Sequence, residues 1–90
     1  MTARRIIVRG RVQGVGFRWH ALRLAAGLPL TGWVRNLPDG SVECFVQGEE
    51  AAIRRFMDVL SDGPPGSRVD DLADVVTDVD PAVVAFGIRH

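Results

Sequence analysis

The residues whose types and spacing could perform chemistry lie in one short stretch, Val8-Arg9-Gly10-Arg11-Val12-Gln13-Gly14-Val15-Gly16-Phe17-Arg18. An alternating apolar run stops there at Gly14 and Gly16, and Arg18 follows at the expected start of a helix. Glycine lets consecutive backbone N–H groups turn toward one point, because it has no Cβ to block a positive φ or a close approach. A helix N-terminus adds partial positive charge, and an arginine fork binds two phosphate oxygens. The stretch therefore predicts a pocket for an anion.

Charge is distributed unevenly along the chain, although eleven arginines and eleven acidic residues give a formal net charge of zero. Residues 1–36 hold seven arginines and no acid, whereas residues 37–90 hold four arginines and every acid. This arrangement predicts an anionic ligand near the N-terminal third, unless the two sets of charges interleave once the chain folds. Lysine is absent, which excludes lysine-based chemistry such as Schiff-base formation.

Length and composition indicate one small soluble domain over residues 1–90. Ninety residues suffice for a single core, and 47% apolar with 24% charged residues is typical of a folded globular protein. The long apolar-leaning stretch 19–34 is broken by charged residues and proline, and no secretory signal precedes it. Cys44 has no cysteine partner for an internal disulfide. We therefore expect a cytoplasmic protein with no membrane partner, and a monomer.

The N-terminal elements should place the glycines between a strand and a helix. Alternating apolar residues predict a strand over 4–12, followed by a glycine loop over 13–17 and a helix over 18–26. Gly27 is expected to follow the helix as its C′ residue. Apolar residues recur at helical spacing along this helix, namely at Trp19, Leu22 and Ala26.

The middle of the chain predicts a hairpin and a second helix. Leu37-Pro38-Asp39-Gly40 has Pro, Asp and Gly in turn-forming order, so residues 31–36 and 41–47 should form paired strands. The second helix is expected over about 49–60, because apolar residues recur there with a helical period, at Ile53, Phe56, Met57 and Leu60.

The order of elements predicts the fold class. After the loop 63–66, the shared parity of Val75, Thr77 and Val79 indicates a fourth strand within 67–79, and a short strand should cover 84–89. The order β-α-β-β-α-β is typical of the α+β ferredoxin-like split β-α-β sandwich, with two helices on one face of an antiparallel sheet. Right-handed crossovers should place the first and third strands centrally, flanked by the second and fourth.

Two motifs of the chain resemble the signatures of the acylphosphatase family. The first is Val8-x-Gly10-x-Val12-Gln13-Gly14-Val15-x-Phe17-Arg18, and the second is Gly32-Trp33-Val34-Arg35-Asn36-x-x-x-Gly40-x-Val42, followed by Gly48. The resemblance covers essentially all 90 residues, including Gly63-Pro64-Pro65-Gly66 and Phe86-x-Ile88-Arg89. Similar sequences usually carry glycine where this chain has Pro29. We therefore expect the first helix to end early, with Gly27 as its cap.

The resemblance implies hydrolysis of the mixed anhydride of a carboxylate and phosphate, with no cofactor. Arg18 and Asn36 would be the catalytic residues, since Arg18 would hold the phosphoryl group and the neutral amide of Asn36 would position water without repelling a dianion. The substrate's own phosphate oxygens would take the proton from that water, and His20 as a base is the alternative. The remaining phosphoryl oxygens would be bound by backbone N–H groups, those of Gln13, Gly14, Val15, Gly16, Phe17 and Arg18.

The other conspicuous residues have structural interpretations. Phe17 is expected to anchor the loop in the core, and Gln13 either contributes its N–H or braces the loop with its side chain. Trp19 and Trp33 are expected to pack rather than to bind ligand, and Cys44 to be a small buried hydrophobe. No spacing of His, Cys, Asp or Glu predicts a metal site, so activity should survive a chelator.

Two other functions remain open at this point. A non-catalytic phosphate-binding module could use the same fold, or the chain could be a fragment of a larger carbamoyl-phosphate-handling protein. RNA binding would need paired aromatic residues on the central strands, but the third strand has only Phe45 and the first has none. We therefore expect a small acyl phosphate as the substrate, and no nucleic acid.

Overall fold

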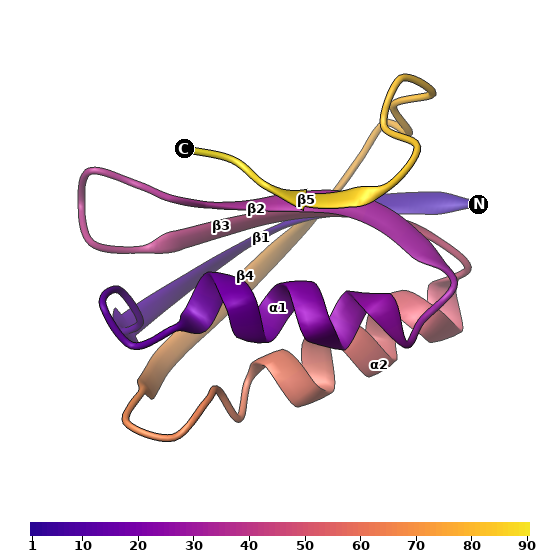
Figure 1. Cartoon of the computed structure of the whole chain (residues 1–90). Coiled ribbons are helices and arrows are strands. Elements are labelled where there is room, and N and C mark those ends of the chain that lie inside the picture. The colour runs from indigo at the N-terminus through magenta and orange to yellow at the C-terminus, as the bar shows by residue number, and fades with distance from the viewer.

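A computed structural model describes residues 1–90 as two helices on one face of a five-stranded sheet (Figure 1). The other face of the sheet carries no helix. Neither helix is both long and apolar enough to cross a lipid bilayer. The order matches the expected one, with β1 (Thr2–Arg11), α1 (Phe17–Ala26), β2 (Leu30–Asn36), β3 (Val42–Gly48), α2 (Glu50–Leu60), β4 (Arg68–Thr77) and β5 (Phe86–Ile88).

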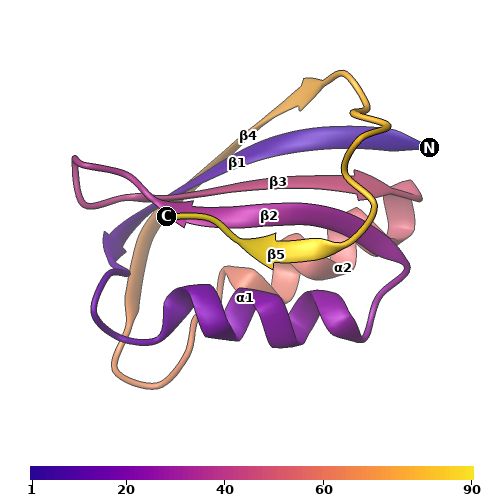
Figure 2. The same cartoon turned by 45° about the horizontal axis from the view of Figure 1, so that its top comes forward.

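The strand order in the sheet is β4-β1-β3-β2-β5, so β1 and β3 are central, as the crossover rule predicts. These first four strands pair antiparallel, and β2 and β3 form the expected hairpin. The fifth strand differs from the prediction of an antiparallel sheet, because β5 pairs parallel with β2. The linker 78–85 crosses from the β4 edge of the sheet to the β2 edge (Figure 2). The chain direction reverses along this linker, so β5 runs antiparallel to β4 and parallel to β2.

The first helix buries Phe17, Ala21 and Ala25 against the sheet. The apolar residues at helical spacing that indicated the helix, Trp19, Leu22 and Ala26, do not form its buried face. Trp19 is 61% exposed, so the expectation that it packs was wrong. The second helix buries Ile53, Phe56 and Leu60, and Met57 packs partly against the core, as predicted.

The ends of two elements also differ from the expected ones. The first helix ends at Ala26 with Gly27 as its C-cap, as expected before Pro29, but Gly27 has φ −90° and therefore does not need to be glycine. In the fourth strand, Val75 is 60% exposed and Val79 lies beyond its end at Thr77. The partly buried apolar residues of β4 are Val69 and Leu72. The two residues differ in parity, but a β-bulge opposite Arg9 and Gly10 shifts the register of β4 between them.

Glu43 of β3 is buried on the face of the sheet that lacks helices. Its carboxylate accepts hydrogen bonds from Arg5 of β1 and from Arg35 of β2, on the two neighbouring strands. Burial opposes its charged form, but the hydrogen bonds from Arg5 and Arg35 outweigh it, so the pKa of Glu43 lies below its usual value.

The substitution Glu43→Gln should lower the free energy of unfolding by about 1–3 kcal/mol at neutral pH, because it removes the anion between two arginines. A carboxyl group whose pKa is lower in the folded than in the unfolded state stabilises the fold at pH values above its unfolded-state pKa. This stabilisation is lost as the pH falls through the folded-state pKa. The difference between wild type and Glu43→Gln should therefore shrink toward acid.

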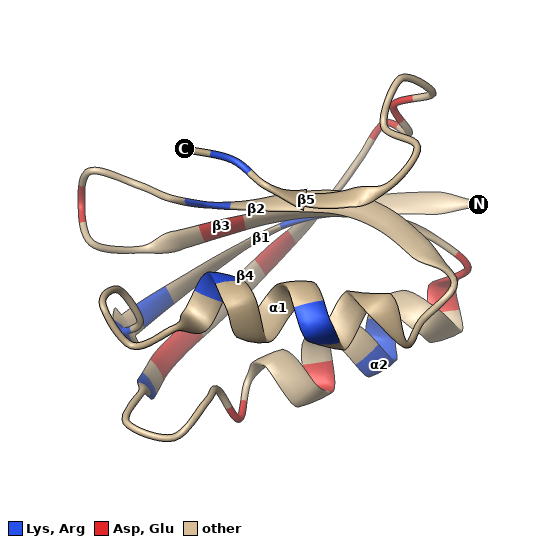
Figure 3. Ribbon diagram, viewed as in Figure 1, with Lys and Arg blue, Asp and Glu red and all other residues tan.

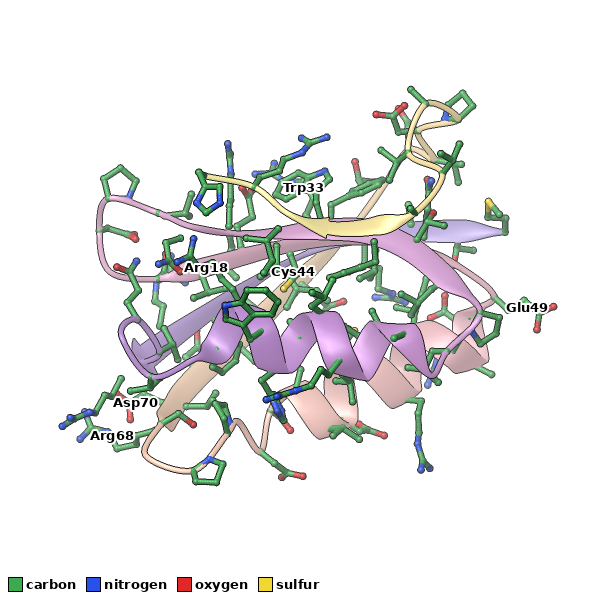
Figure 4. All side chains as sticks on the ribbon, in the orientation of Figure 1. Arg18, Trp33, Cys44, Glu49, Arg68 and Asp70 are labelled. Carbon is green, nitrogen blue, oxygen red and sulfur yellow. The ribbon has the colours of Figure 1, made fainter.

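Urea unfolding between about pH 7 and pH 3 measures this difference. The matched control is Glu49→Gln, because Glu49 is exposed, makes no side-chain hydrogen bond at the start of α2 and points away from the fold (Figure 4). Equal losses in the two variants at neutral pH would contradict the prediction.

Candidate active site

The loop between β1 and α1 bends at two glycines. Gly14 has φ 73° and Gly16 has φ 79°, and an added Cβ would meet no atom within 4 Å at either position. The glycines are therefore required by backbone conformation and not by crowding. The bend places Gly16 as the N-cap of α1, and its carbonyl accepts the hydrogen bond of the His20 N–H.

The N-terminus of α1 has no compensating negative group. No side chain caps it, and its first turn contains no acid but does contain Arg18. Most helices carry a capping oxygen or a carboxylate there, because the first N–H groups lack partners and the dipole is positive. The start of this helix thus presents free N–H donors together with a guanidinium.

A cleft of about 160 Å³ lies at this helix start, and it brings together both predicted catalytic residues, which come from α1 and from the end of β2. The Oδ1 atom of Asn36 is buried and has no hydrogen-bond partner. In Figure 4, Arg18 lies between the start of α1 and the sheet. The residues that line the cleft are Val12, Gly14, Gly16, Phe17, Arg18, Trp19 and Asn36.

Two residues of the predicted loop, Gln13 and Val15, do not line the cleft. The Nε2 atom of Gln13 donates to the carbonyl oxygens of Leu37 at 2.8 Å and Ser41 at 2.9 Å. The side chain therefore braces the loop against the β2–β3 turn, which is one of the two roles expected for Gln13. Val15 packs partly against the core, and Phe17 is only 2% exposed, so it anchors the loop as expected.

The uneven charge along the chain is partly neutralised by folding. Arg4, Arg5, Arg9 and Arg35 pair with acids of the C-terminal part, so the alternative of interleaved charges holds for them. Arg11, Arg18 and Arg23 have no carboxylate partner within 4.0 Å. Figure 3 shows basic residues at the end of β1 and at the start of α1, the two ends that the glycine loop joins.

The side-chain partner of Arg18 is His90, which sequence reasoning missed. The Nη1 atom of Arg18 lies 3.3 Å from the Nδ1 atom of His90. A guanidinium can only donate, so in this hydrogen bond the Nδ1 atom of His90 is the acceptor. No local signal could have found this pair, because it depends on β5 returning alongside β2.

His20, the alternative base, does not line the cleft. Its ring lies 6.2 Å from the ring of Phe17, and its Nε2 atom is buried without a partner. Burial lowers the pKa of His20, Arg23 lowers it further, and Asp62 opposes them. The position of His20 therefore gives no support to its role as the base.

No group of three or more His, Cys, Asp or Glu side chains is placed to hold a metal ion. Cys44 is fully buried, as predicted, and burial raises the pKa of its thiol well above the usual value. That thiol is therefore a packing group and not a nucleophile.

Similarity to known proteins extends over most of the chain. A family model described as acylphosphatase matches residues 4–88. An acylphosphatase from Anaeromyxobacter dehalogenans is 51% identical over 87 residues, which cover 94% of this chain and 91% of the relative.

Solved structures agree with this result. The crystal structure of an acylphosphatase from Bacillus subtilis is 39% identical, covers both chains completely and has a TM-score of 0.95. The structure of full-length HypF in a phosphate- and nucleotide-bound form is 30% identical, with a TM-score of 0.87; the match covers 99% of this chain and 12% of HypF.

Replacing Gly16 by alanine tests the backbone conformation of the loop alone, because the added Cβ would contact no neighbouring atom. The left-handed conformation at φ 79° should cost about 1–2 kcal/mol of stability with a Cβ present. If the loop relaxes to avoid this cost, its N–H groups turn away, so affinity for inorganic phosphate should fall about tenfold or more.

NMR titration with inorganic phosphate and urea unfolding measure the two effects. The matched control is Gly87→Ala, because Gly87 has open space around it and no positive φ. A Gly16→Ala variant that keeps wild-type stability, and whose loop has therefore relaxed, but binds phosphate like the wild type would show that the loop is not the anion site.

Proposed function

The chain belongs to the acylphosphatase family and hydrolyses the carboxyl–phosphate bond of acyl phosphates, and we propose that it does so in the cleft between the glycine loop and Asn36. One observation carries this proposal. Arg18, at the uncapped start of α1, and Asn36, whose Oδ1 atom is buried without a hydrogen-bond partner, line the same cleft. The first group suits a phosphoryl dianion, and the second suits a water molecule beside it.

Arg18 and the loop hold the phosphoryl group in this proposal. The guanidinium donates to two of its oxygens, and N–H groups of Gln13 to Arg18 bind the others. In a loose transition state the equatorial oxygens keep their charge while charge grows on the leaving oxygen, so donors fixed in advance need no reorganisation. The brace from Gln13 keeps the loop in place.

Asn36 positions the attacking water. Its Oδ1 atom accepts a hydrogen bond from the water, and the amide carries no charge that would repel the dianion. Because Oδ1 has no protein partner, it is free for this bond. The amide thus aims the water at phosphorus, in line with the bond that breaks.

The reaction needs no protein base. The water oxygen bonds to phosphorus, and the carboxylate leaves with the electron pair of the P–O bond. The water proton passes to an oxygen of the phosphoryl group, which leaves as inorganic phosphate. A carboxylate is a good leaving group and departs without protonation. No cofactor or metal enters these steps.

We also propose that residues 1–90 act as one domain, as a monomer in the cytoplasm and without nucleic acid. The support for the domain is a single cluster of core residues that draws on both helices and on β1, β2 and β3. The support for the cytoplasm is the lone buried thiol of Cys44.

Release of phosphate from benzoyl phosphate in the presence of a chelator tests the site. Arg18→Ala and Asn36→Ala should each lower kcat/KM by about 10²–10³, the usual effect of losing one fixed donor or positioning group. Arg23→Ala is the matched control, because Arg23 is exposed on the same helix outside the cleft. Activity that survives both changes, or that the chelator abolishes, would contradict the proposed mechanism.

The contact between His90 and Arg18 leads to a second test. His90→Ala should raise KM about 3–10-fold, since it removes a hydrogen bond that holds the guanidinium. His90→Asn should restore most of the affinity, because its Oδ1 atom can accept at nearly the position of Nδ1. Steady-state kinetics with benzoyl phosphate measure both, and equal KM values for the two variants would show that the contact does not position Arg18.

A further inference from the structure

We propose that Trp19 binds the acyl group of the substrate and favours aromatic over small acyl groups. This inference rests on the proposed function, because it takes the phosphoryl group to lie against the glycine loop and Arg18. It names the part of the substrate that those residues do not contact.

Trp19 is exposed at the place where a ligand would cover it. Its side chain is 61% exposed, although it lines the same cleft as Arg18 and Asn36. The core-facing positions of α1 are Phe17, Ala21 and Ala25, so Trp19 is directed out of the core. Ligand clefts are lined mainly by hydrophobic and aromatic side chains, and the exposed indole can bury its ring against a ligand there.

The rest of the cleft offers no other apolar surface to a ligand. Val12 and Phe17 line it, but they are only 1% and 2% exposed, because they are part of the core. Gly14 and Gly16 present backbone, and Asn36 presents an amide. Trp19 is therefore the large, exposed apolar side chain that this cleft offers to an acyl group bonded to the phosphoryl oxygen.

The second tryptophan of the chain shows the contrast. Trp33 stacks on Phe45 with ring centroids 5.9 Å apart, and the guanidinium groups of Arg89 and Arg35 lie 4.7 and 5.2 Å from its ring centre. Trp19 has no such ring or cation partner. Trp33 lies on the side of the sheet away from α1 (Figure 4), so it serves as a matched control.

The expected effect is a change in substrate preference. Stacking of a benzoyl ring on an indole should strengthen binding about 2–10-fold relative to an acetyl group, which is too small to cover the ring. The ratio of kcat/KM for benzoyl phosphate to that for acetyl phosphate should therefore fall about 2–10-fold in Trp19→Ala, mainly through KM. Trp19→Phe should keep most of the ratio, because it keeps a ring.

Trp33→Phe should leave the ratio at the wild-type value. Trp19→Ala is expected to fold, because alanine is the best helix former and the indole lies outside the core. An unchanged ratio in Trp19→Ala, or an equal change in Trp33→Phe, would overturn the proposal.

Tryptophan fluorescence tests the contact directly, because the chain has two tryptophans. In a Trp33→Phe background, where Trp19 is the remaining tryptophan, benzoate should change the emission and acetate at equal concentration should not. In a Trp19→Phe background neither carboxylate should change it. Equal responses to benzoate in the two backgrounds would overturn the proposal.

The failure of this inference can be told from the failure of the proposed function. If Arg18→Ala abolishes hydrolysis of both substrates while Trp19→Ala leaves their ratio unchanged, the site stands and the acyl contact falls. If Arg18→Ala hydrolyses both substrates like the wild type, the site itself is wrong, and the inference from Trp19 falls with it.

Discussion

At Gly14 and Gly16 the backbone takes positive φ values, and this bend joins the end of β1 directly to the start of α1. The rest of the site depends on it. A side chain at either position would be strained, so a substitution there should distort the loop between β1 and α1. The bend also sets the register of the helix, so that Phe17 enters the core while Arg18 and Trp19 reach the cleft.

The charges of the fold leave this one helix start uncompensated. Glu43 lies buried between Arg5 and Arg35, and the carboxylates of Glu50 and Asp74 accept hydrogen bonds from Arg4. These pairs neutralise much of the basic N-terminal third within the sheet and at α2. A chain of zero net charge can therefore keep a local excess of positive charge at the N-terminus of α1, where the dipole adds to it.

The sequence predicted the element order, because glycine, turn and alternation signals are local. The crossover rule then predicted the central strands, and the resemblance to acylphosphatases predicted that Arg18 and Asn36 share a site. The sequence failed for α1, where apolar residues lie on several sides, so helical spacing fits more than one face. Only tertiary packing selects the face of Phe17. The parallel pairing of β5 and the contact of His90 with Arg18 depend on a return of the chain that no local pattern specifies.

That return is fixed by Gln47, a buried polar residue of β3. Its Nε2 atom donates to the carbonyl oxygens of Asp80 and Val83, and its Oε1 atom accepts from the Asp80 N–H. These bonds satisfy a buried amide and hold the linker that leads from β4 to β5, which pairs with the β2 edge. His90 then reaches Arg18, which means that one amide in the sheet helps to place a guanidinium at the far end of the fold.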